Sequence, residues 1–99
     1  MTYEIQVDDN FYYMDRSAGY RTGNFQTYKE ARAACVAIVQ AFFREEASGA
    51  KSAAEAYELY TSSGPDPWIV GEPQPPADER FSAWTYAEAY SKERWARMA

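Results

Sequence analysis

The chain has 99 residues, a length typical of one domain with a single hydrophobic core. Its formal net charge of -5 argues against direct binding to nucleic acid or to an anionic membrane, because both require a basic surface. It contains no histidine and one cysteine, which excludes the usual zinc ligand sets and an intrachain disulfide.

The first quarter of the chain predicts a small antiparallel meander. Residues 3–7 alternate apolar and polar side chains, which is typical of a half-buried strand. Asp8, Asp9 and Asn10 favour a turn. Residues 11–14 can then form a second strand, either across a tight hairpin or beyond a bulge in one bent strand, and residues 20–26 a third.

Two capping boxes predict the next two helices. Thr27 and Glu30 begin a helix over residues 28–47, and Ser52 and Glu55 begin a shorter helix that ends at Gly64. The first helix has an apolar stripe at three- and four-residue spacing. Its members are Tyr28, Ala31, Cys35, Ile38 and Phe42. The apolar side of the second comprises Ala53, Ala56, Tyr57 and Tyr60.

The last third predicts a strand, a loop and a helix. Residues 67–71 form a short apolar run bounded by turn residues, so we expect a strand, followed by an exposed proline-rich loop over residues 71–80. Ser82 should cap the last helix, with Phe81 and Tyr86 as its hydrophobic staple. The face expected to dock comprises Trp84, Ala87, Ser91, Trp95 and Met98.

These elements predict one α+β domain over residues 1–99. A small antiparallel β-meander should pack against two longer α-helices and one short helix, in the order β-β-β-α-α-β-α. Leu, Ile, Val and Phe together number 13, whereas aromatic residues make up 17% of the chain. Because each large aromatic side chain buries roughly 150–250 Å², we expect rings packed on alanine-rich helices to supply much of the core.

The acidic and aromatic side chains are the candidates for a binding surface, because Tyr and Trp bury large areas with few rotatable bonds. The candidates are Asp8, Asp9, Asn10, Tyr12, Tyr13, Asp15, Trp68 and Trp84. The alternative is structural: Asp and Asn belong in turns without any ligand, and most of the rings belong to the core. The acidic spacing is not that of a calcium loop, so we expect no metal and no cofactor.

No motif specific to an enzyme is present. Cys35 lies in the middle of a helix with no histidine to activate it, so we expect a buried, unreactive thiol. The chain has no glycine-rich phosphate loop and no nucleophile elbow. It also has no apolar run of about 20 residues and no secretory signal, so we expect a cytoplasmic protein.

Three blocks carry a resemblance over nearly the whole chain. They read Asp8-Asp9-Asn10-Phe11-x-Tyr13-Met14-Asp15, Glu30-Ala31-x-x-Ala34-Cys35 and Phe81-Ser82-Ala83-Trp84-x-Tyr86-Ala87. Together they resemble a group of small bacterial proteins of unknown function. The resemblance implies a stand-alone cytosolic α+β protein and carries no activity across.

The function expected from the sequence is that of a non-catalytic binding or regulatory protein. Its partner should be another protein, contacted through the acidic and aromatic segment 8–15, and a homodimer is a further expectation because aliphatic residues are scarce. One alternative is an acidic decoy that occupies a basic nucleic-acid-binding groove. Another is a small enzyme that uses tyrosines and carboxylates.

Overall fold

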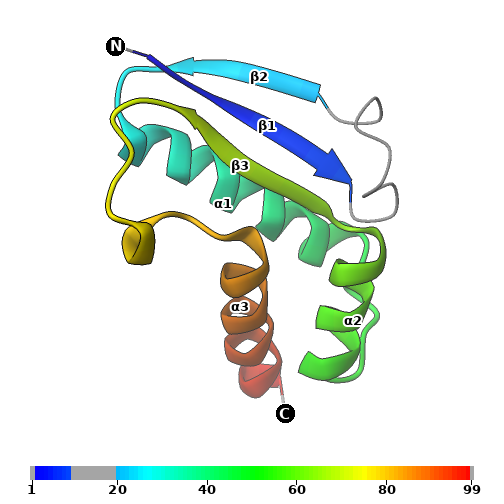
Figure 1. Cartoon of the computed structure of the whole chain (residues 1–99). Coiled ribbons are helices and arrows are strands. Elements are labelled where there is room, and N and C mark those ends of the chain that lie inside the picture. The colour runs from blue at the N-terminus through cyan, green and yellow to red at the C-terminus, as the bar shows by residue number, and fades with distance from the viewer. Residues whose placement is uncertain (1, 10–19, 99) are drawn as a thin grey trace.

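A computed structural model of the chain describes residues 2–9 and 20–98. In that part of the chain a sheet lies on one helix, and two further helices extend away from the sheet (Figure 1). The elements are β1 (Tyr3–Asp9), β2 (Tyr20–Phe25), α1 (Tyr28–Glu45), α2 (Ala53–Ser63), β3 (Pro65–Gly71), a 3-10 turn (Ala77–Glu79) and α3 (Ala83–Met98). The predicted α+β class is confirmed, with the described elements in the order β-β-α-α-β-α.

The sheet has the strand order β2-β1-β3, and both neighbouring pairs are antiparallel. Asp8 and Asp9, which we assigned to a turn, instead continue β1 and pair with Asp66 and Pro65 of β3. That prediction was wrong because acidic residues favour a turn only where no neighbouring strand takes their backbone hydrogen bonds. The strand predicted over residues 11–14 lies outside the described residues.

One face of the sheet packs on α1, and the three helices lie on that side (Figure 1). Tyr3, Ile5 and Val7 alternate along β1 and are each no more than 5% exposed. They meet Ala31 and Cys35 of α1, which are fully buried. Small side chains at these two helix positions allow the backbone of α1 to lie close to the sheet.

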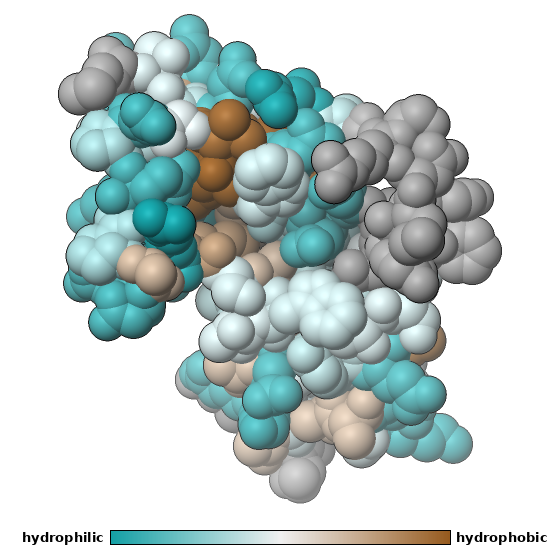
Figure 2. Space-filling model, in the orientation of Figure 1, coloured by the Kyte–Doolittle hydropathy of each residue, from teal (hydrophilic) through white to brown (hydrophobic). Residues whose placement is uncertain are grey.

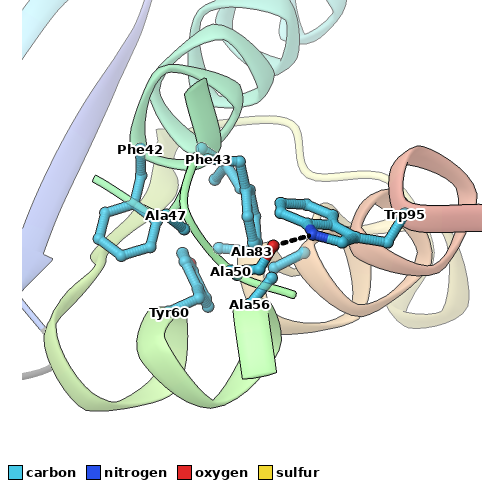
Figure 3. Close-up of a cluster of buried hydrophobic side chains, with 10 residues drawn as sticks. Phe42, Phe43, Ala47, Ala50, Ala56, Tyr60, Ala83 and Trp95 are labelled. Atoms are coloured by element: carbon cyan, nitrogen blue, oxygen red, sulfur yellow. Dashed lines mark hydrogen bonds between the residues drawn. The ribbon is translucent and has the colours of Figure 1, made fainter. Parts of the chain in front are cut away.

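The second half of α1 packs against α2 and α3 through aromatic rings (Figure 3). Phe43 stacks on Tyr60 with ring centroids 5.7 Å apart and meets Trp95 at 6.0 Å. The indole Nε1 of Trp95 donates a hydrogen bond of 2.7 Å to the backbone oxygen of Ala50. In this cluster rings on three helices supply the apolar area that aliphatic residues supply in most domains.

The helix starts agree with the sequence. Thr27 accepts from the Glu30 amide and Ser52 from the Glu55 amide, both at 3.1 Å. The rings of Phe81 and Tyr86 lie 6.0 Å apart, as a hydrophobic staple requires. None of the helices in the described part of the chain is long and apolar enough to cross a membrane.

The docking face predicted for α3 was wrong at its first residue. Trp84 is 43% exposed, whereas its neighbour Ala83 is 3% exposed and belongs to the helical cluster, the buried cluster in which α1, α2 and α3 pack together. Ala87, Ser91 and Trp95 are buried as predicted. Adjacent residues on a helix lie about 100° apart, so the small Ala83 occupies the crowded position against α1 and directs the indole of Trp84 outward.

Candidate functional site

The face of the sheet opposite α1 carries the polar side chains of β1 and their neighbours on β2 and β3. Strand alternation puts Glu4, Gln6 and Asp8 on this face, while their neighbours along β1 are buried against α1. We call this surface the outer sheet face. In Figure 2 the surface over the strands is largely hydrophilic, with one small hydrophobic area. The other described members of this face are Arg21, Asp66, Trp68 and Val70.

A chain of polar contacts runs across all three strands of this face. The indole Nε1 of Trp68 donates to Oδ2 of Asp8 at 3.1 Å, and Nε2 of Gln6 donates to Oδ1 of the same carboxylate at 3.0 Å. Nε of Arg21 then donates to Oε1 of Gln6 at 3.4 Å, and its Nη1 lies 3.7 Å from a carboxylate oxygen of Glu4. Both oxygens of Asp8 are therefore engaged, and the indole of Trp68 is held in one orientation.

Trp68 combines exposure with this fixed orientation. Its side chain is 45% exposed although it stands on a strand whose neighbouring residues, Pro67 and Ile69, are buried. An exposed ring on a rigid strand loses little conformational entropy when it binds, because its rotamer is already selected. This is the property that distinguishes an aromatic binding anchor from a flexible surface side chain.

Two carboxylates face each other at one end of the outer sheet face. Asp8 and Asp66 are direct partners across β1 and β3. Partial burial raises the pKa of Asp66 above its ordinary value, and the negative charge of Asp8 raises it further. A positive charge placed between these side chains would reverse the second effect, so this end of the face favours a cationic contact.

The predicted candidates are distributed unevenly over the structure. Asp8 and Trp68, which are 60 positions apart in the chain, are brought into direct contact. Asp9 lies at the end of β1, and Trp84 is exposed on α3 rather than on the sheet. The candidates Asn10, Tyr12, Tyr13 and Asp15 lie outside the described residues.

Sequence reasoning missed Gln6, Arg21 and Asp66. The alternation of residues 3–7 places Gln6 opposite the buried residues of β1, and that pattern could have identified it. Arg21 and Asp66 become neighbours of β1 only through strand pairing, which no local pattern in the chain announces.

Among the described residues, neither a reactive thiol nor a set of metal-binding side chains lies on the outer sheet face. Cys35 is fully buried between α1 and the sheet, and burial raises the pKa of its thiol from 9.0 to about 12. Such a thiol stays protonated at neutral pH and is a poor nucleophile. Within residues 2–9 and 20–98, no group of three or more His, Cys, Asp or Glu side chains is placed to hold a metal ion.

Comparison of the chain with protein-family models, with curated proteins and with solved structures gives no match. The resemblance to the group of small bacterial proteins therefore stays a prediction.

Proposed function

We propose that this protein is a non-catalytic binding protein whose outer sheet face docks a positively charged segment of another protein. The observation that carries the proposal is Trp68: an indole that is almost half exposed and is nevertheless held by a hydrogen bond to Asp8. Trp is among the residues most enriched at the centres of protein interfaces. A partner would bury the exposed part of this ring without having to order it first.

The charge of the face indicates the chemistry of the partner. Glu4, Asp8 and Asp66 contribute three negative charges and Arg21 one positive charge, which leaves a net charge of -2. A lysine or arginine of the partner would approach Asp8 and Asp66, relieve their mutual repulsion, and lie within reach of the face of the Trp68 ring. A basic segment therefore fits this surface better than an acidic or purely apolar one.

The same residues give less support to the alternative that the protein is an acidic decoy in a basic nucleic-acid-binding groove. Double-stranded DNA carries one negative charge per roughly 1.7 Å of helix axis, whereas the described outer face has three carboxylates, one of which lies 3.7 Å from Arg21. An aromatic anchor with two carboxylates beside it resembles a protein-binding site more closely than a row of phosphates.

The test compares three forms of the full chain as bait: the unaltered protein, Trp68→Ala, and Trp84→Ala as the matched control. Both tryptophans are exposed to a similar degree, so the two variants lose similar surface area. Partners captured from a bacterial lysate are identified, and peptides covering their basic segments are titrated into each form. We expect Trp68→Ala to weaken binding by about 30-fold, as a hot-spot residue does, and Trp84→Ala to leave it nearly unchanged.

Two further measurements test the proposal: the salt dependence of peptide affinity and the oligomeric state of the free chain. Affinity for the peptide should fall only moderately between low and physiological salt, because the indole contributes apolar contact. An affinity that collapses with salt and ignores Trp68→Ala would contradict the proposal and favour the decoy. Sedimentation of the free chain tests the homodimer: a dimer that dissociates in Trp68→Ala would make a second copy the occupant of this face.

A further inference from the structure

A cavity of about 430 Å³ lies away from the outer sheet face, between α1, the start of α3 and the loop that contains the 3-10 turn. In Figure 2 a notch separates the left-hand part of the surface from the helices below it. In Figure 1 the 3-10 turn lies on one side of this notch and α3 lies on the other. A cavity of this size matches sites for small organic molecules. The lining residues used below are Arg32, Arg80, Phe81, Ser82, Thr85 and Tyr86.

Hydrogen bonds between distant parts of the chain hold the walls of this cavity. The backbone amide of Phe81 donates to the hydroxyl of Tyr28 at 2.8 Å, and Nε2 of Gln40 donates to the hydroxyl of Tyr86 at 2.6 Å. Both bonds join α1 to the start of α3. The aromatic wall formed by Phe81 and Tyr86 therefore exists before any ligand arrives, which lowers the cost of binding.

Two arginines from separate parts of the chain, Arg32 and Arg80, line the cavity. Arg32 of α1 lies over the ring of Phe81, 5.6 Å from its centroid. Arg80 is held by a bond of 2.9 Å from its Nε to the backbone oxygen of Pro75. Among the residues that the structure describes, neither guanidinium lies within 4.0 Å of a carboxylate. Within that part of the chain, each guanidinium group therefore has N–H donors left for another acceptor, and a ring or a backbone contact sets its position.

We infer that this cavity binds a small organic molecule that carries a phosphate group. A phosphate monoester offers three acceptor oxygens and close to two negative charges, which suits two guanidinium groups, whereas a carboxylate offers two oxygens and one charge. Ser82 and Thr85 also line the cavity, and each has a hydroxyl group that can donate a hydrogen bond to a further oxygen. The cavity is larger than a phosphate ion alone, and its aromatic wall suits an apolar or planar body attached to the phosphate.

Asp78 and Glu79 also line the cavity and oppose an anion. With the net charge of -5, they make long-range attraction of a phosphate weak. Recognition then depends on direct contact with Arg32 and Arg80. Charge substitutions therefore test the site: removing a positive side chain should weaken binding of the phosphate, and removing a negative side chain should strengthen it.

The experiment titrates phenyl phosphate into the isotope-labelled full chain and follows backbone amide shifts. We expect shifts at residues 80–86 and near Arg32. Arg32→Gln and Arg80→Gln should each weaken binding about tenfold or more, as loss of a charged hydrogen-bond partner does. Arg44→Gln is the matched control, since Arg44 is an exposed arginine in the last turn of α1 and does not line the cavity. Asp78→Asn should tighten binding.

Two further probes separate the contribution of the phosphate group from that of the ring. Phenol, which lacks the phosphate, should cause no shifts at these amides, and inorganic phosphate, which lacks the ring, should bind about tenfold more weakly than phenyl phosphate. The inference is overturned if phenyl phosphate causes no shifts up to about 10 mM, a concentration that would saturate even a millimolar site. It is also overturned if Arg44→Gln weakens binding as much as Arg32→Gln, because the contact would then be diffuse surface attraction.

Discussion

Replacing Trp95 with phenylalanine should lower the free energy of unfolding by about 2–4 kcal/mol. The indole Nε1 donates to the backbone oxygen of Ala50, and both residues are no more than 8% exposed. Phenylalanine cannot donate, so that oxygen stays buried without its partner, which costs about 1–3 kcal/mol. The smaller ring also leaves a void on the order of 40 Å³ beside Phe43, which adds about 1 kcal/mol at ~24 cal/mol per Å³.

Urea denaturation followed by far-UV circular dichroism measures this loss without relying on tryptophan fluorescence. Trp84→Phe is the matched control, since the same substitution at a side chain that is 43% exposed should change the unfolding free energy by about 0.5 kcal/mol or less. For a domain of this size, Trp95→Phe should lower Tm by roughly 10–30 °C. Equal urea midpoints for the two variants would refute the account of the helical cluster.

Two other substitutions test the sheet. Gly71→Ala should lower the free energy of unfolding by about 1–3 kcal/mol, because Gly71 has φ +137° and an added Cβ would lie 2.8 Å from the Tyr3 ring. The control is Gly49→Ala, which has open space around the added Cβ and should be nearly neutral in the same urea assay. Asp66→Asn should stabilise the protein at neutral pH and lose this advantage below pH 3.8. The folded pKa of Asp66 is raised by burial and by Asp8, so the folded state holds its proton more tightly and stability falls as pH rises above 3.8. Equal pH dependence of the unfolding free energy in the variant and the unaltered protein would contradict this.

The parts of the fold that the sequence predicted depend on contacts between near neighbours in the chain. The pairs Thr27 with Glu30 and Ser52 with Glu55 identify helix starts because a capping side chain reaches an amide three residues on. The alternation of residues 3–7 identifies the buried face of β1 for a similar reason, since side chains on a strand point to opposite faces in turn.

The errors occurred where a distant segment competes with a local preference. Asp8 and Asp9 favour a turn by themselves, yet β3 supplies their backbone partners from 56 or more positions along the chain. Trp84 and Ala83 are equally compatible with the start of a helix, and only the space between α3 and α1 decides which of them is buried. The sequence suggested both Asp8 and Trp68 as binding candidates, but nothing in it indicated that they touch each other.

By itself, the amino-acid sequence determined the α+β class, the starts of the three helices and the reliance of the core on aromatic rings. These follow from capping, periodicity and composition, which act over a few residues or over the whole chain. Only the tertiary structure decided that β3 pairs beside β1, that Trp68 is held by Asp8 on an uncovered face, and that Arg32 and Arg80 line one cavity. Each of these joins residues more than 40 positions apart, and a contact of that kind depends on the packing of the whole chain rather than on local propensity.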